Sequence, residues 1–379
     1  MRCLSVVTLS PMTGYSRLSL AAVLVSLGAC QNRTDAPTLD LPATADTLTL
    51  ASGAITEGAW LHGETWAVLE PDDAKVWLVD FSDRSTVVVG TPGEDYRSPY
   101  GIFSFRDTLF VNDWGMGRTT MWSADGDLLD AIPVGNTTRG ALPRARDAAG
   151  RFYVAVRSPP GPDGRGNQDS AAVLRTSHQF DRVDTVAMLS PLDIEEVFGD
   201  AGHRFERRVF SGEDAWGVFP GGTVWVARVN HNRVWLFPAD AAQHNGPMLP
   251  DPVWPVTQAD REVFLRRFPD GLRKAAEQLP FATIKPPFLA GLTGADGNVW
   301  LQKSGQLSDT VQLYHQVGPD GELRALIRVP LPARILAVGP DRILVVQSVV
   351  NGVRLWQFLQ PPPQPDQAAP EMSMTTLPK

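Results

Sequence analysis

The sequence predicts an all-β protein: a single six-bladed β-propeller of four-stranded blades, closed by an N-terminal strand, with a short helical insertion after the fourth blade. Two observations predict this fold. A turn followed by a short β-rich run recurs six times, and each run is followed by a second one. Gly (33 residues) and Pro (32 residues) are also abundant, as expected for many tight turns between short strands.

The first repeated run is centred on six large apolar residues that we take as equivalent. They are Trp66, Phe110, Tyr153, Trp225, Trp300 and Leu344. The steps between them are 44, 43, 72, 75 and 44 residues. The shorter step is the length of a four-stranded propeller blade, and the two long steps indicate insertions.

A second β-rich run follows each of these residues, and in two places an Asp-Gly turn leads on to a third. The turns are Asp125-Gly126 and Asp320-Gly321. Asp-Gly between apolar runs is a specific hairpin signal. Most of the 11 Trp residues fall on the two repeated runs, where they would fill the space between blades. We therefore interpret them as core residues rather than ligand contacts.

The two ends of the repeat predict how the ring closes. After Trp356 no further strand is available, because Pro361-Pro362-Pro363 cannot continue a hydrogen-bonded ladder. Near the start, Asp46-Thr47-Leu48-Thr49-Leu50 alternates like a strand but belongs to no blade of its own. We expect it to complete the sixth blade, which leaves no open edge at the seam.

The insertions are expected to be short and partly helical. Residues 257–279 begin with Thr257 and Asp260, which are typical of a helix N-terminus, and Pro269 should divide the segment into two short helices. We favour an amphipathic helix packed on the rim of the barrel; the alternative is a lid or a partner-docking helix. A helical turn is expected around Leu192–Phe198.

The N-terminal segment predicts export. Arg17 precedes a ten-residue apolar run, too short to span a bilayer, so residues 1–29 are expected to be a signal peptide. The run ends in Leu27-Gly28-Ala29-Cys30, which resembles the lipobox of bacterial lipoproteins and implies that Cys30 carries the lipid. Gln31 after the cysteine implies sorting to the outer membrane. Residues 30–45 are expected to form a flexible tether and residues 360–379 a disordered Pro-rich tail.

The blade around Phe110 resembles the NHL repeat. Its features are a glycine-rich turn at Gly90–Gly93, then Pro99-Tyr100-Gly101-Ile102, a strand ending at Asp113, and a later strand followed by Asp125-Gly126. This resemblance implies a six-bladed, NHL-like lipoprotein of the bacterial envelope. It implies a fold and a setting but no activity, because one fold hosts many functions.

Ligands of propellers bind where loops converge at the mouth of the channel. The ends of the repeated strands offer several polar residues for such a site. The candidates are Asn112, Asp113, Arg157, Arg228, Asn230, His231 and Lys303. Arg157, Arg228 and Lys303 would form a basic mouth suited to a carboxylate or an acidic glycan; the alternative, which we favour, is salt bridging to acids on neighbouring loops.

No catalytic residue, metal site or cofactor is assigned from the sequence. There is no Gly-x-Ser-x-Gly, and the six His residues show no metal-ligand spacing. Six-bladed lactonases of the gluconolactonase type hold a divalent cation with Glu, Asn and Asp. Asp113, Asn230 and Asn232 match those types, but Arg228 and Lys303 stand where other acids would be needed.

The predicted function is therefore a non-enzymatic, envelope-tethered binding or scaffold protein that presents a propeller face to a protein, peptide or glycan. The alternative is a metal-dependent hydrolase or lactonase, or a lyase, acting at the channel mouth. A net charge of −8 and the lack of a basic run exclude nucleic acid as an expected partner.

Overall fold

The computed structural model describes residues 36–157, 170–199 and 202–360. The chain divides into two compact units, Met1–Asp35 and Ala36–Lys379, and the propeller belongs to the second. The predicted signal peptide (1–29), the lipidation site Cys30 and nearly all of the predicted tail (361–379) lie outside the described residues. Within the described part, no helix is long and apolar enough to cross a membrane.

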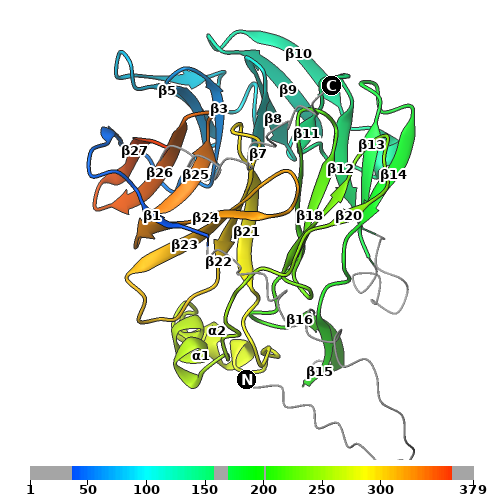
Figure 1. Cartoon of the computed structure of the whole chain (residues 1–379), viewed down its shortest axis with the longest axis vertical. Helices are drawn as coiled ribbons and strands as arrows, with labels where there is room; N and C mark the ends of the chain where they lie inside the picture. The colour runs from blue at the N-terminus through cyan, green and yellow to red at the C-terminus, as the bar shows by residue number, and fades with distance from the viewer. Residues whose placement is uncertain (1–35, 158–169, 200–201, 361–379) are drawn as a thin grey trace, which may run out of the picture. The chain divides into compact units, whose positions relative to one another are not determined.

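Six antiparallel sheets form the blades, which confirms the predicted six-bladed propeller (Figure 1). The first blade contains β3 (Glu57–His62), β4 (Thr65–Glu70), β5 (Lys75–Asp80) and β6 (Ser85–Val89). The second contains β7 (Pro99–Phe105), β8 (Thr108–Asp113), β9 (Arg118–Ser123) and β10 (Leu128–Pro133). The third contains β11 (Ala145–Arg146), β12 (Phe152–Val156), β13 (Ala172–Thr176) and β14 (Val183–Met188).

The remaining blades complete the ring. The fourth contains β17 (Ala215–Val218), β18 (Val224–Arg228), β19 (Arg233–Phe237) and β20 (His244–Asn245). The fifth contains β21 (Phe288–Thr293), β22 (Val299–Lys303), β23 (Val311–Val317) and β24 (Leu323–Pro330). The sixth contains β25 (Arg334–Val338), β26 (Arg342–Val349), β27 (Gly352–Leu359) and β2 (Asp46–Leu50). A short 3-10 helix, Asn136–Thr138, lies between the second and third blades.

The six residues taken as equivalent occupy the second strand of each blade, and all are buried. Each packs in a cluster shared between neighbouring blades; for example, Trp225 lies with Phe288 and Leu301 of the fifth blade. Large side chains at this position bury wide apolar faces against the next blade, which stabilises the ring.

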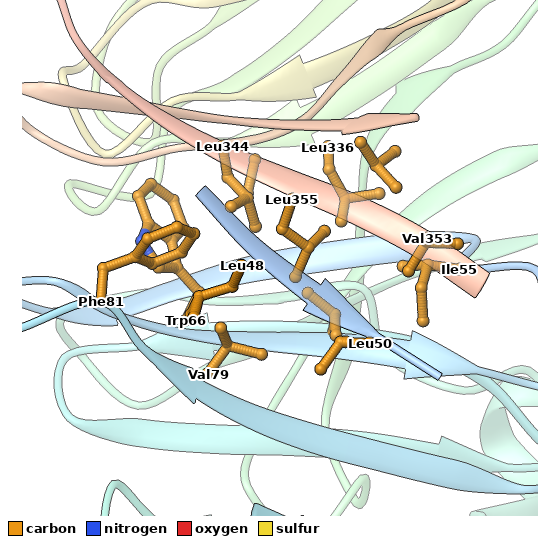
Figure 2. Close-up of a cluster of buried hydrophobic side chains, with 13 residues drawn as sticks. Leu48, Leu50, Ile55, Trp66, Val79, Phe81, Leu336, Leu344, Val353 and Leu355 are labelled. Carbon is orange, nitrogen blue, oxygen red and sulfur yellow. The ribbon is translucent and has the colours of Figure 1, made fainter. Parts of the chain in front are cut away.

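The seam between the sixth and first blades closes as predicted. β2 pairs antiparallel with β27, from Asp46 opposite Gln357 to Leu50 opposite Val353. Leu48 and Leu50 lie in one buried cluster with Leu355 of the sixth blade and Trp66 of the first, as Figure 2 shows. The N-terminal strand thereby covers the outer edge of the last blade and leaves no unpaired ladder at the seam.

The prediction of a flexible tether over residues 30–45 is wrong for part of that segment. β1 (Thr38–Asp40) pairs in parallel with β24 as a fifth strand of the fifth blade, with Thr38 opposite Leu326. Leu39 and Leu41 pack against the cluster shared by the fifth and sixth blades. Two apolar side chains in an otherwise polar stretch are enough to fix it on the exposed edge of the sheet.

The helical insertion is present as predicted. α1 (Gln258–Leu265) begins with a capping box between Thr257 and Asp260, and α2 (Asp270–Ala276) begins directly after Pro269. The helical turn expected around Leu192–Phe198 is wrong. This segment is a β-hairpin of β15 (Ile194–Gly199) and β16 (Gly202–Arg207), in which Phe198 is paired with His203.

The two insertions contact each other, and Figure 1 shows α1, α2 and β16 close together. Val209, just after β16, forms a parallel bridge with Phe281, just after α2. Their backbones are joined by hydrogen bonds from Val209 N to Pro280 O (2.8 Å) and from Ala282 N to Val209 O (2.9 Å). The rings of Phe210, Phe264 and Phe281 meet at centroid distances of 5.6–6.2 Å. The insertions therefore share a small aromatic core.

Candidate functional site

The inner strands of all six blades run in the same direction, which gives the propeller two distinct faces. The connections between blades and the turns between second and third strands lie where the inner strands begin. We call this side the insertion face, because the hairpin β15–β16 and the helices α1 and α2 belong to its connections. The opposite side, where the inner strands end in tight turns, is the turn face.

A central channel of about 730 Å³ runs between the inner strands. It is lined by residues of β3, β7, β11, β17, β21 and β25, from Thr56 and Tyr100 on the insertion face to Arg106 and Ala148 on the turn face. This volume lies within the range of about 300–1,000 Å³ that is typical of small-ligand sites. The channel is therefore a candidate site for a small ligand or a short segment of a larger one.

The charges that line the channel are unbalanced. Its lining contains one carboxylate, Glu57, and four arginines, which are Arg106, Arg144, Arg146 and Arg334. None of the four arginines forms an ion pair with a described residue. Low-dielectric walls focus such a charge, so the lumen attracts anions although the whole protein is acidic.

Glu57 and Arg334 link neighbouring blades near the insertion face. Glu57 Oε2 accepts a hydrogen bond from Ile102 N of the second blade at 2.9 Å. Arg334 Nη2 donates to Ile55 O (2.6 Å) and Thr56 O (3.1 Å), which precede the first blade. Burial raises the pKa of Glu57, while the Ile102 N–H and the nearby Arg144 and Arg334 charges act in the opposite direction.

Arg106 and Arg146 lie together toward the turn face. The Arg146 guanidinium packs over the rings of Phe110 (5.7 Å) and Phe152 (5.4 Å). Its Nε is buried without a hydrogen-bond partner among the described residues. Burial lowers the pKa of Arg146; Asp147 acts against this shift, and the like charge of Arg106 adds to it. The two arginines thus hold positive charge in one place, next to an unused donor.

The predicted site residues Asn112 and Asp113 are both buried at the end of β8. Asn112 lines the channel, where its amide donates to Pro143 O at 2.6 Å and accepts from Thr119 Oγ1 at 2.8 Å. Asp113 does not line the channel. Its carboxylate accepts hydrogen bonds from the backbone N–H groups of Arg97, Ser98 and Met116, so it fixes the loop between the first and second blades.

Arg157 and Arg228 also lie outside the channel lining, because each is held by an acid from the connection before the fourth blade. Arg157 Nη2 is 3.2 Å from Glu213 Oε2. Arg228 is buried, donates to Asp214 Oδ2 at 2.8 Å and packs over Trp235 at 4.3 Å. The salt-bridge alternative therefore describes both residues, with Glu213 and Asp214 as the partners.

Lys303 belongs to a buried charged cluster between the fourth and fifth blades rather than to the channel. Its Nζ is 2.6 Å from Asp251 Oδ2 and 3.3 Å from Asn232 Oδ1. His315 Nε2 is 3.3 Å from the other oxygen of Asp251. Burial and the Lys303 charge lower the pKa of His315 to about 4, so this histidine is neutral near pH 7.

Asn230 and His231 are exposed in the turn after β18, and His231 stacks on Trp235 at 5.7 Å. Asp113, Asn230 and Asn232, the set compared with lactonases, do not form a ligand group. Asp113 is tied to backbone N–H groups, and the Asn232 amide donates to Leu249 O and to Asp251. Over the described ranges, no group of three or more His, Cys, Asp or Glu side chains is placed to hold a metal ion.

Sequence reasoning missed the channel arginines because it followed the second and third strands, whose apolar repeat is strong. The inner strands carry no comparable repeat, and β11 has only two residues. One signal was present: Arg144 and Arg146 alternate around Ala145, and alternate residues of a strand point to the same side. An alternating basic pair just before the Phe152 strand could have marked a charged inner strand.

Comparison with known proteins adds only a general likeness. No protein-family model and no curated protein matches the chain. Among solved structures, virginiamycin B lyase from Staphylococcus aureus is 8% identical with a TM-score of 0.45, and covers 84% of this chain and 99% of its own. The calcium-binding protein regucalcin from Agrobacterium tumefaciens is 11% identical (TM-score 0.45; 86% and 97% covered). A DUF4221 family member from Bacteroides vulgatus is 7% identical (TM-score 0.47; 83% and 96% covered). The propeller assignment rests on strand topology, and these likenesses carry no inference about activity.

Proposed function

We propose that this protein is a non-enzymatic binding protein that takes an anionic group of its partner into the central channel. The observation that carries the proposal is the lining itself, in which four arginines face one carboxylate. An enclosed anion gains charge-assisted hydrogen bonds from guanidinium groups that are already in place, at little cost in reorganisation. Arg144 is exposed and forms no ion pair with a described residue, so its guanidinium is available to such an anion.

The insertion face is the side that meets the partner in this proposal. Large exposed apolar residues gather in its loops and at its strand ends; they include Trp114, Phe198, Val253, Leu272, Ile284, Leu289, Leu307, Leu331 and Val350. The strand ends of the opposite face carry fewer such residues, which are Leu128, Leu129, Val183 and Leu359. An apolar rim around a charged opening is typical of a surface that binds another molecule.

Attachment to the cell envelope through Cys30 is part of the same proposal, with the outer membrane as the expected location. Acylation of Cys30 would hold the propeller close to the lipid surface. Cys30 and Thr38 are eight residues apart, and an extended chain covers about 3.3–3.6 Å per residue, or about 28 Å in all. A Cys30→Ala variant should lose incorporated palmitate and move from the membrane pellet to the soluble fraction; an unchanged distribution would refute the anchor.

The binding proposal is tested by isothermal titration of a capped triglutamate peptide, a probe that carries three carboxylates. Arg144→Ala should weaken binding by about ten-fold, which corresponds to the loss of one charged contact. Arg157→Ala is the matched control, because it removes an arginine paired outside the channel lining, and it should change affinity by less than about two-fold. Equal losses in both variants, or no binding to the wild-type protein, would overturn the proposal.

A further inference from the structure

We infer that the anionic partner is an extended peptide with acidic side chains at alternate positions, held along Arg144 and Arg146 inside the channel. The inference rests on the proposed function and names its partner class. Arg144, Ala145 and Arg146 all line the channel, but the Ala145 side chain packs toward the core of the third and fourth blades, whereas the Arg146 guanidinium packs toward Phe110 of the second blade. The third blade therefore presents two guanidinium groups on one side of one strand.

The spacing of this pair is that of a β-strand. Successive residues of a strand rise by about 3.3 Å, so Arg144 and Arg146 are offset by about 6.6 Å along the channel wall. An extended peptide places its own alternate side chains at the same interval and on one side. Carboxylates at alternate positions of such a peptide meet the two arginines in register, whereas adjacent carboxylates point to opposite sides.

Asp147, the acid next to Arg146 in the sequence, is already hydrogen-bonded to other residues. It therefore does not neutralise the charge of Arg144 and Arg146. Asp147 accepts hydrogen bonds from Tyr153 Oη (2.8 Å) and from the Arg151 backbone (2.9 Å) and side chain (2.7 Å). Arg146 keeps a buried Nε without a partner among the described residues, and Arg106 extends the positive charge toward the turn face. A bound carboxylate would lie between two like charges and offset their repulsion.

The facing wall suits the remaining side chains of such a peptide. In a six-bladed ring, the second and third blades face the fifth and sixth. The fifth and sixth blades contribute Ala290, Leu292 and Leu336 to the lining, and β21 contains no charged residue. A channel of about 730 Å³ admits a short extended segment but no folded domain. Arg334 of the sixth blade also lines the channel, but its guanidinium donates to Ile55 O and Thr56 O near the insertion face. The Arg144–Arg146 side and the uncharged β21 side therefore match a strand with acidic and uncharged residues in alternation.

The test uses three probes of equal charge with the full-length protein: the capped peptide Glu-Ser-Glu-Ser-Glu, its capped isomer Glu-Glu-Ser-Ser-Glu, in which no two carboxylates are two residues apart, and trigalacturonate as an acidic glycan. Titration should show the alternating peptide binding about ten-fold tighter than its isomer. Arg146→Met keeps the aliphatic packing on Phe110 but removes the charge, and it should abolish this preference. Arg157→Met is the matched control and should retain it. Thermal melting verifies that each variant is folded.

The outcomes separate this inference from the proposed function. Equal affinity for the two peptides would overturn the alternating register while leaving an anion-binding channel in place. Tighter binding of trigalacturonate than of either peptide would overturn the peptide class in favour of a glycan. Binding of none of the three probes would overturn both proposals. If Arg146→Met still preferred the alternating peptide, the Arg144–Arg146 pair would not be the cause of that preference, and the inference would be overturned.

Discussion

The channel arginines and the cations at the ends of the second strands look alike in the sequence but differ in their surroundings. Arg157, Arg228 and Lys303 each lie within 3.2 Å of an acid from the connections around the fourth blade, namely Glu213, Asp214 and Asp251. The arginines of the channel lining form no ion pair with described residues, and Glu57 is the one carboxylate beside them.

This difference shows that the position of a cation relative to the blade connections decides its role. A basic residue at the end of a second strand meets the acidic loop that leads into the next inner strand, so it fastens two blades together. A basic residue on an inner strand faces the lumen, where the acids of the loops do not reach it. Charge that is balanced within the fold stabilises the fold, and charge that is unbalanced is available to a ligand.

The largest expected effect comes from breaking the buried pair of Arg228 and Asp214. Asp214→Ala leaves a buried guanidinium without its counter-charge and removes the acceptor for Ser190 N and Val229 N. The free energy of unfolding should fall by about 3–5 kcal/mol. Urea denaturation measures this loss. Arg144→Ala is the comparison, and it should lower the free energy of unfolding by less than about 1 kcal/mol. A similar loss in both variants would contradict the distinction between the two groups.

A slightly smaller effect is expected from His315 as the pH changes. Its pKa is lowered to about 4 from an unfolded value of 6.5, so the unfolded chain binds the proton first as the pH falls. The stability contribution of neutral His315 is therefore full above pH 6.5 and is lost as the pH falls toward 4. The loss amounts to about 3 kcal/mol. Denaturation at pH 7 and pH 4.5 should show a smaller difference for His315→Gln than for wild type; equal differences would refute this.

Glu57 should make anion binding in the channel stronger as the pH falls. Burial raises its pKa, so this carboxyl is protonated before ordinary surface carboxylates as the pH falls. Neutral Glu57 leaves the channel arginines unopposed, and an anionic probe should bind several-fold tighter at pH 4.5, the ordinary pKa of a glutamate, than at pH 7. Titration with a sulfonate probe avoids protonation of the ligand. Glu57→Gln should bind tightly at both pH values, and a variant that keeps the wild-type pH dependence would exclude Glu57 as the cause.

The smallest effect is expected at Arg157. This arginine and Glu213 form a partly exposed pair at 3.2 Å, with side-chain exposures of 30% and 50%. Exposed ion pairs contribute about 0–1 kcal/mol, so Glu213→Ala should lower the free energy of unfolding by less than about 1 kcal/mol. Urea denaturation of Glu213→Ala beside Asp214→Ala compares two neighbouring acids directly. A loss at Glu213 as large as that at Asp214 would mean that burial does not separate the two pairs.

The fold was predictable because one fully buried position recurs in every blade and requires a large apolar residue. Trp66, Trp225 and their equivalents must fill the space between blades, so large apolar residues recur there. Closure by Asp46–Leu50 was predictable from its alternation. The hairpin β15–β16 was not predictable, because it occurs once and its pairing joins Ile194 to Arg207 across a turn that lacks an Asp-Gly signal.

The candidate site was less predictable because it depends on which charges are neutralised in three dimensions. Arg228 and Lys303 were rightly placed at strand ends, but Asp214 and Asp251 come from segments that no local pattern connects to them. The basic mouth considered from the sequence consists of Arg157, Arg228 and Lys303, whereas the arginines that line the channel are four other residues. Only the assembled ring shows that the unpaired arginines lie on the inner strands or directly beside them.

The most direct test of this account is anomalous diffraction from a crystal soaked in bromide, which reports where anions gather without any assumption about the natural ligand. The account predicts bromide peaks inside the channel beside Arg144, Arg146 or Arg334, and none beside Arg228 or Lys303. Peaks at Arg228 or Lys303 with an empty channel would contradict it, because the balanced and unbalanced charges would then have been assigned the wrong way round.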